Sequence, residues 1–370
     1  MRVAIDVTSL LHARAGIGTY VSEVLPRLAA RPEVDVTAFA VTWRGRNRVA
    51  SIVPAGVDVN RGFMAARPLH VVWRHVDWPV LEWWTGRVDV VLGSNFVVPP
   101  TRRAARVALV HDLTAWRFPE LVDAPTRRFP SLVARAVERG AHVLTVSETV
   151  AAELTAIARV PADRVHWVHN GLTVPAGGQA AEGRRRAGGA RYVLAVGTIE
   201  PRKDYPTLVR AFDAVAATDP DIRLVIAGVD GWGTEPFDAA LVAARHGDRI
   251  VRLGYVDDAA KADLMAGAVV FAYPSRYEGF GMPPLEAMAA GIPVVTTRAG
   301  ALPEVVGAAA ELVAPGDVDA LAGAIALVLD DSDRRADLVR RGHERAARYS
   351  WDATADGVVE VLRHVALARE

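Results

Sequence analysis

The stretch "YEGFGMPPLEAMAAGIPVV", residues 277–295, sets two glutamates in a segment rich in glycine, proline and apolar residues. It follows the apolar run "VVFAYPS" at 269–275, which has the composition of a buried strand. Its glycines let the backbone approach a ligand closely, and its proline pair suits a first helical turn. We therefore predict a strand, a loop holding Glu278, and a short helix holding Glu286. A helix in which Glu286 only complements the dipole would explain neither Glu278 nor the glycines.

Similar apolar runs recur along the chain and alternate with segments of helical periodicity. They lie at 2–8, 34–41, 88–92, 107–110 and 143–146, and again at 192–198, 223–229, 250–256 and 293–297. Short apolar strands alternating with helices favour an α/β fold with doubly covered parallel sheets.

The length of 370 residues exceeds the roughly 250–300 residues at which single cores stop growing, so we predict two domains. The segment 174–190 is Gly-rich, charged and non-periodic, which is typical of a linker. The predicted domains are therefore 1–173 and 191–349, each with its own sheet.

The composition is that of an ordinary soluble protein, with 51% hydrophobic and 23% charged residues and a formal net charge of zero. No overall field attracts nucleic acid. The absence of cysteine excludes disulfides, thiolate metal sites and a cysteine nucleophile. The N-terminus lacks signal-peptide features and no uncharged apolar run approaches ~20 residues, so we expect a cytoplasmic protein.

Several catalytic patterns are missing. The sequence contains no serine-hydrolase elbow and no P-loop, and we identify no Asp/Glu/His cluster at metal-ligand spacing, which disfavours a metal-dependent enzyme. The N-terminal glycines Gly16 and Gly18 suggest a phosphate-binding turn after the first strand, with a simple tight turn as the alternative. Without a third glycine they do not make a dinucleotide fingerprint.

Two further candidates follow predicted strands, where ligands bind in open α/β sheets. In "GTIEPRKD", residues 197–204, Arg202 and Lys203 would stand near a helix start and form a diphosphate clamp. The alternative is a solvated surface pair. His111 follows the strand at 107–110, and structural and catalytic roles are equally compatible with that place.

In these residues the chain resembles the retaining glycosyltransferases of family 4, which have the GT-B fold: two Rossmann-like, doubly wound parallel-sheet domains facing a cleft. The most specific element is the E-x(7)-E pattern of Glu278 and Glu286. The segments "GIGTY" (16–20), "LVHDL" (109–113), "TVSE" (145–148), "VHNG" (168–171) and "VGTIEPRKD" (196–204) also match, so the resemblance covers nearly the whole chain.

The resemblance implies roles for these residues. Glu286 would hold the ribose and Glu278 the transferred sugar, while Arg202 and Lys203 would neutralise the diphosphate and His111 would reach the sugar from the first domain. The implied catalytic residues are Glu278, Arg202, Lys203 and His111. The implied donor-binding residues are Gly16, Gly18, Gly197, Arg202, Lys203, Gly254, Tyr255, Glu278, Gly279, Phe280, Gly281 and Glu286. The family needs no metal or other cofactor, retains the anomeric configuration by front-face attack, and has a last helix, here 350–370, that crosses back to the first domain.

The resemblance is greatest to the mannosyltransferase side of the family, which implies GDP-mannose as donor, with UDP-glucose second, and a glycan or glycoside as acceptor. A nucleotide-sugar-binding protein without catalysis, and a sugar-phosphate synthase or phosphorylase, are the alternatives. The acceptor would lie mainly in the first domain. There a basic helix could contact an anionic acceptor or a membrane surface, or could simply be solvated; its arginines are Arg127, Arg128, Arg135 and Arg139. A cluster of tryptophans could stack on sugar rings or pack in the core; its members are Trp73, Trp78, Trp83 and Trp84.

Overall fold

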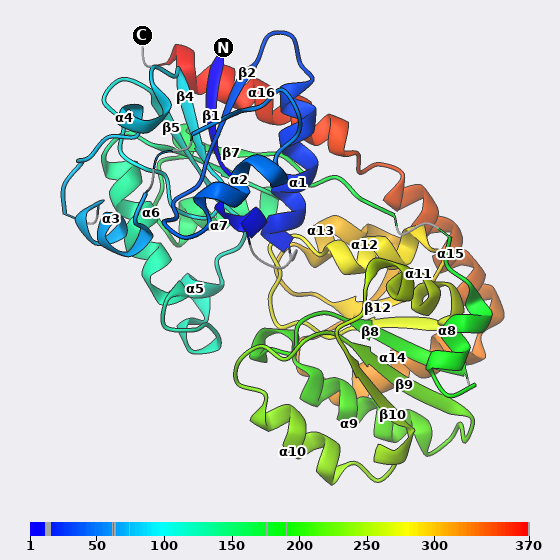
Figure 1. The fold of residues 1–370 in the computed structure, drawn as a ribbon. Coiled ribbons are helices and arrows are strands. Elements are labelled where there is room, and N and C mark those ends of the chain that lie inside the picture. The colour runs from blue at the N-terminus through cyan, green and yellow to red at the C-terminus, as the bar shows by residue number, and fades with distance from the viewer. Residues whose placement is uncertain are drawn as a thin grey trace. The chain divides into compact units, whose positions relative to one another are not determined.

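The computed structural model describes residues 1–11, 16–60, 62, 64–73, 75–174, 177–189 and 191–368. The chain forms two compact units, each built on its own parallel sheet (Figure 1). The N-terminal unit comprises 1–119, 124–171 and 350–370, and the C-terminal unit comprises 120–123 and 172–349.

The N-terminal unit holds a seven-stranded parallel sheet in the order β3-β2-β1-β4-β5-β6-β7. Its strands are β1 Arg2–Asp6, β2 Asp35–Phe39, β3 Asp58–Val59, β4 Val90–Gly93, β5 Ala105–Val110, β6 His142–Thr145 and β7 Val165–Trp167. Its helices are α1 Gly16–Ala29, α2 Arg46–Ile52, α3 Ala66–Trp73, α4 Glu82–Thr85, α5 Thr114–Arg117, α6 Phe129–Glu138, α7 Glu148–Ala156 and α16 Trp351–Leu367. The central strands β4 and β5 are buried along their whole length, which explains why their sequence is apolar except at Arg106.

The C-terminal unit holds a six-stranded parallel sheet in the order β10-β9-β8-β11-β12-β13. Its strands are β8 Arg191–Val196, β9 Ile222–Ala227, β10 Ile250–Gly254, β11 Val270–Tyr273, β12 Val294–Thr297 and β13 Ala310–Val313. Its helices are α8 Ala180–Arg186, α9 Tyr205–Ala216, α10 Glu235–Ala243, α11 Asp258–Gly267, α12 Met282–Ala289, α13 Leu302–Val306, α14 Val318–Asp330 and α15 Ser332–Ala346. Helices cover both faces of this sheet, and one fully buried cluster joins α9, α14 and the strands.

In both sheets the strand order reverses at one place. The reversal falls between β1 and β4 in the N-terminal unit and between β8 and β11 in the C-terminal unit. Loops that leave the carboxyl ends of such a strand pair run in opposite directions, and the crevice between them is where open α/β sheets bind ligands.

The last helix, α16, packs within the N-terminal unit. The Trp351 ring lies edge-on to Tyr20 of α1, with 6.1 Å between centroids. Trp351 also touches the point where the chain leaves this unit, since a Cβ added to Gly171 would fall 2.3 Å from its backbone nitrogen. Val358, Leu362 and Val365 bury the apolar face of the helix.

Two local expectations differ from the structure. Gly16 and Gly18, expected in a turn after the first strand, lie in the first turn of α1, which begins at Gly16. The segment predicted as a linker contains α8, which packs on α11. Gly183 makes this possible, because a Cβ there would come within 2.1 Å of the Asp263 carbonyl oxygen. Gly183, one of the glycines that gave the segment its linker composition, thus serves a close helix contact.

None of the described helices combines the length and the apolar character needed to cross a membrane.

Candidate functional site

Three charged side chains meet at the carboxyl ends of β8 and β11. Arg202 and Lys203 belong to a 3-10 turn that follows β8, and Glu278 follows β11. The Lys203 Nζ lies 2.6 Å from one Glu278 carboxylate oxygen, and an Arg202 guanidinium nitrogen lies 2.7 Å from the other. The predicted residues therefore form one ionic cluster at the point where the strand order reverses.

Neighbouring residues fix the geometry of this cluster, and the sequence did not single them out. The Tyr273 hydroxyl, at the end of β11, donates to Glu278 across 3.0 Å and also contacts the Lys203 ammonium. The Arg202 guanidinium donates to the Glu200 carboxylate and to the Tyr277 carbonyl, at 2.7 and 2.9 Å. The position of Tyr273 and Glu200 beside strand ends was the available signal, because polar groups there face the ligand crevice.

The cluster is buried, with Glu278 and Lys203 only 6% and 8% exposed. Burial alone would raise the pKa of Glu278, but the charges of Arg202 and Lys203 outweigh it and lower this pKa to about 2. Burial also lowers the pKa of Lys203, and the Glu278 charge opposes that shift. Glu278 is therefore a carboxylate that accepts hydrogen bonds at neutral pH and is not a proton donor.

The loop around Glu278 is held by the segment that follows β12. The Ala301 amide donates to the Glu278 carbonyl across 2.9 Å. Gly300 has φ +54°, and a Cβ there would lie 2.2 Å from the same carbonyl oxygen. Gly281, at φ +110°, is the N-cap residue before α12, and a Cβ there would lie 2.6 Å from a methyl carbon of Leu302. The glycine requirement at 281 and 300 thus includes packing of this loop against its neighbour.

Glu286 lies on α12 and is 8% exposed. Its carboxylate forms an ion pair with Lys261 of α11, with 2.7 Å between Nζ and Oε2. The proline pair occupies the first helical turn, as the sequence predicts. Lys261 was missed because nothing local connects residue 261 to residue 286.

The other predicted donor-binding residues of this unit also follow strands. Gly197 follows β8 and accepts a hydrogen bond from the Tyr205 hydroxyl at 3.0 Å. Gly254 ends β10 with φ +69°, and Tyr255 next to it is 74% exposed. Gly279 and Phe280 continue the Glu278 loop, and the buried Phe280 ring packs edge-on against Tyr349.

The predicted residues of the N-terminal unit lie at its own strand ends. His111 follows β5, and its Nε2–H donates to the Ser94 carbonyl across 2.9 Å. Burial lowers the pKa of His111, so its ring is neutral at pH 7. Tyr20 packs edge-on against it at 5.6 Å. Gly16 and Gly18, in the first turn of α1, belong to the same unit.

Part of the predicted basic helix is neutralised. Arg135 of α6 and Arg139, which follows the last residue of that helix, both pair with Asp77, at 3.6 and 2.9 Å. The tryptophans differ in exposure: Trp73 is buried, while Trp78 and Trp83 are exposed and pack edge to face, with 5.3 Å between ring centroids.

No group of three or more His, Cys, Asp or Glu side chains in the described part of the chain could hold a metal ion.

Comparison with known proteins covers both units. The family model described as "Glycosyl transferases group 1" matches residues 180–345, and that of "Glycosyltransferase Family 4" matches residues 14–174. The chain is 28% identical to the O-antigen chain mannosyltransferase B of Escherichia coli, over 95% of this chain and 97% of that one. It is 30% identical to a D-inositol 3-phosphate glycosyltransferase of Saccharomonospora viridis, over 77% of this chain and 69% of the relative.

A solved structure shares the fold at low sequence identity. Anabaena Alr3699/HepE, determined in complex with UDP and glucose, has a TM-score of 0.76 and 17% identity, covering 98% of this chain and all of that one. The likeness confirms the predicted GT-B fold of two parallel-sheet α/β domains.

Proposed function

Because the chain belongs to the group 1 glycosyltransferases, we propose that it transfers mannose from GDP-mannose to a glycan or glycoside acceptor with retention of configuration. One observation carries the assignment of the site: the Glu278 carboxylate is held between Arg202 and Lys203 where the strand order of the C-terminal sheet reverses. Two cations and a carboxylate that can accept hydrogen bonds from sugar hydroxyls then lie together in the crevice where such sheets bind nucleotides.

Each charged group has a part in this proposal. Breaking the bond from the anomeric carbon to the phosphate leaves negative charge on the diphosphate, and the fixed cations Arg202 and Lys203 stabilise it where it develops. Glu278 accepts hydrogen bonds from hydroxyls of the transferred sugar, and Glu286 from those of the ribose. These two cations also supply the positive charge that a metal ion would otherwise provide, so we propose a metal-independent reaction.

The structure adds a condition to this scheme. Both cations form ion pairs with Glu278. An incoming diphosphate therefore competes with Glu278 for them, and the carboxylate becomes available to the sugar as its partners turn to the phosphates. Donor binding and the orientation of Glu278 are coupled through the same ion pairs.

The N-terminal unit would supply the remaining groups. Neutral His111, whose Nε2–H is engaged by the Ser94 carbonyl, can accept one hydrogen bond from a sugar hydroxyl at Nδ1. Gly16 and Gly18 place helix amides of α1 for the diphosphate. In front-face retention, a leaving phosphate oxygen takes the proton of the acceptor hydroxyl while that hydroxyl oxygen bonds to the anomeric carbon. No protein nucleophile is required in this step.

The choice of mannose rests on the relatives. The Escherichia coli protein, similar over nearly the full length, is named a mannosyltransferase. UDP-glucose is the second candidate, because the HepE structure of the same fold was determined with UDP and glucose.

Nucleotide release from purified full-length protein, with a chelator present, tests the proposal. GDP-mannose and UDP-glucose are compared with and without a panel of glycoside acceptors, and the anomeric configuration of the product is read by NMR. We expect GDP release to exceed UDP release, an α-linked product, and loss of turnover in Lys203→Met with the fold intact. Nucleotide binding without transfer to any acceptor would favour the non-catalytic alternative. Turnover that requires phosphate would favour a phosphorylase.

A further inference from the structure

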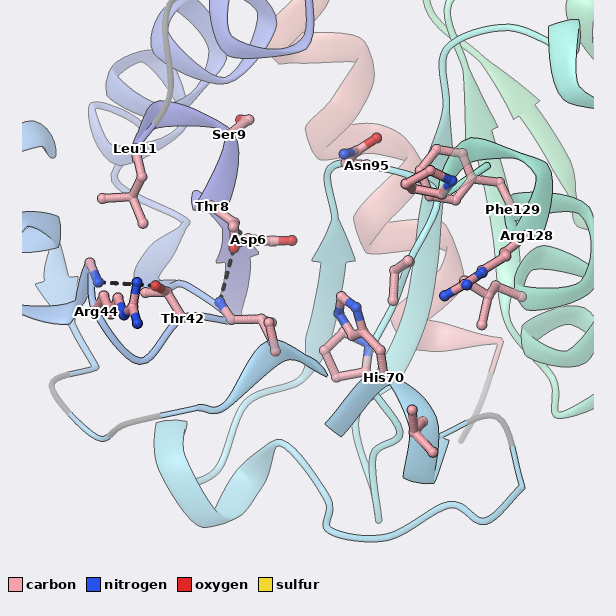
Figure 2. A pocket seen from close by; sticks show the side chains of 18 of the residues that line it. Asp6, Thr8, Ser9, Leu11, Thr42, Arg44, His70, Asn95, Arg128 and Phe129 are labelled. Carbon is pink, nitrogen blue, oxygen red and sulfur yellow. Dashed lines mark hydrogen bonds between the residues drawn. The ribbon is translucent and has the colours of Figure 1, made fainter. Parts of the chain in front are cut away.

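A cavity of about 890 Å³ lies wholly within the N-terminal unit, at the carboxyl ends of β1, β2 and β4 (Figure 2). Asp6 ends β1 and Asn95 follows β4, so the cavity lies where the strand order of this sheet reverses. Its volume is in the upper part of the roughly 300–1,000 Å³ typical of small-molecule sites. This is the place and size expected of a site for a second substrate.

Polar groups inside the cavity lack partners. Asp6 is 7% exposed, and only its Oδ1 is engaged, by the amide and hydroxyl of Thr8 at 2.8 and 2.5 Å. Its Oδ2 has no hydrogen bond to any residue that the structure describes. The Ser9 hydroxyl and the side-chain amide oxygen of Asn95 (Oδ1) are also buried without a described partner. Buried polar groups are almost always hydrogen-bonded, so these atoms indicate a ligand that carries hydroxyl groups.

Positive charge gathers at the exposed part of the same cavity. Arg44, Arg48 and Arg128 line it, against the single carboxylate of Asp6. None of these three guanidinium groups forms an ion pair with a residue in the described ranges, in contrast to Arg135 and Arg139 of the neighbouring helix. In Figure 2 the Arg128 side chain extends toward His70, another lining residue. Unpaired guanidinium groups bind phosphate and carboxylate strongly because their N–H donors match these anions.

We propose that this cavity binds the acceptor, and that the acceptor is a hydroxylated molecule carrying an anionic group. Asp6, Ser9 and Asn95 hold its hydroxyls, and Arg44, Arg48 and Arg128 hold a phosphate or carboxylate. The identification of the bound molecule as an acceptor rests on the proposed transferase function, whereas the chemistry of the cavity does not. The anion can belong to a free sugar phosphate or to a lipid phosphate that carries the sugar.

The test measures binding to the full chain by calorimetry, with GDP present at saturation so that the donor site is occupied. Mannose 6-phosphate is compared with methyl mannoside as the neutral probe. We expect the phosphate to bind at least tenfold more tightly, and the variant Arg44→Gln/Arg128→Gln to lose that advantage. Arg127→Gln, next to Arg128 and outside the cavity lining, is the matched control and should bind like the unaltered chain.

A vesicle arm distinguishes the two sources of the anion. Phosphatidylcholine vesicles with and without phosphatidic acid are sedimented with the same variants. Arginine-dependent binding to the acidic vesicles together with weak binding of mannose 6-phosphate assigns the anion to a lipid. Binding of mannose 6-phosphate alone assigns it to a soluble acceptor. Equal affinity for the neutral and phosphorylated sugars, or an equal loss in Arg127→Gln, overturns the proposal.

These outcomes remain separate from those of the donor assignment. Asp6→Asn should weaken methyl mannoside binding about tenfold, because a charged acceptor of hydroxyl hydrogen bonds is lost. If no nucleotide sugar is turned over yet the probes bind as expected, the transferase function fails and the anion site stands. If hydrolysis proceeds but no probe discriminates, the anionic-acceptor proposal fails alone.

Discussion

The ammonium of Lys261 lies 2.7 Å from the carboxylate of Glu286, and the two residues stand on successive helices, α11 and α12, of the C-terminal unit. Glu286 is 8% exposed, so this ion pair is largely shielded from solvent. The ion pair fixes the rotamer of the carboxylate that we propose binds the ribose, and it leaves oxygen lone pairs free for hydroxyl donors.

The first prediction concerns Lys261→Met. Loss of the Lys261 ammonium leaves the buried Glu286 carboxylate without its cation. We therefore expect the affinity for GDP to fall about three- to tenfold, with kcat little changed. Calorimetric titration with GDP and steady-state kinetics measure the two effects. Lys261→Arg is the matched control and should restore affinity; equal GDP affinity in Lys261→Met would show that the pair does not position Glu286.

The second prediction separates the two glutamates. Glu278→Gln removes the charge that competes with the diphosphate for Arg202 and Lys203, so GDP should bind as tightly as before or more tightly, while transfer falls about 100-fold or more. Glu286→Gln should instead weaken GDP binding. Paired measurements of GDP affinity and turnover check both. If the two variants lose nucleotide binding equally, the division of roles is wrong.

Lys203→Met gives the third prediction. Loss of a fixed cation aimed at the leaving diphosphate should cost ~3–4 kcal/mol of transition-state stabilisation, a drop of roughly 100- to 1,000-fold in kcat/KM, by analogy with oxyanion-hole donors. Circular dichroism establishes that the fold survives. Lys203→Arg keeps the charge and should retain part of the activity. A loss of less than tenfold in Lys203→Met would remove Lys203 from the catalytic cluster.

The loop contact at Gly300 supplies a fourth prediction. Gly300→Ala strains a backbone at φ +54° and drives a Cβ into the Glu278 carbonyl, so we expect unfolding at lower temperature, with a cost of about 1–3 kcal/mol, and reduced transfer. Gly323→Ala in α14, where nothing lies within 4 Å, should be neutral or slightly stabilising. Calorimetric melting of both variants makes the comparison, and an unchanged melting temperature in Gly300→Ala would contradict it.

The fifth prediction concerns acid stability of the N-terminal unit. Burial, with the nearby charges of His142 and His364, lowers the pKa of His166 from 6.5 to about 4. The unfolded chain therefore takes up this proton first, so the contribution of His166 to stability falls as pH drops from 6.5 toward 4. The urea midpoint should be lower at pH 5 than at pH 7. His166→Asn should reduce that difference, and an unchanged difference would assign it to other groups.

Sequence pattern predicted most of the architecture, because unbroken apolar runs such as 107–110 mark strands buried on both faces. It also placed Glu278, Arg202 and Lys203 beside strand ends. It did not predict that they pair with one another, since 75 residues separate Lys203 from Glu278 and only the sheet order brings β8 beside β11. Composition failed at 174–190, where glycines serve the packing of α8 and not a flexible connection.

The contact between Gly171 and Trp351 has a consequence for the evolution and engineering of this chain. The backbone leaves the N-terminal unit after Gly171 and re-enters it at Ser350, and Gly171 touches the next residue, Trp351. In topological terms, residues 172–349 are inserted into the N-terminal domain, and the insertion begins and ends at the same place on that domain. A short peptide that links residue 171 to residue 350 would join the two parts of the N-terminal domain directly. A homologous segment could also replace the insertion at this place without a change to either hydrophobic core.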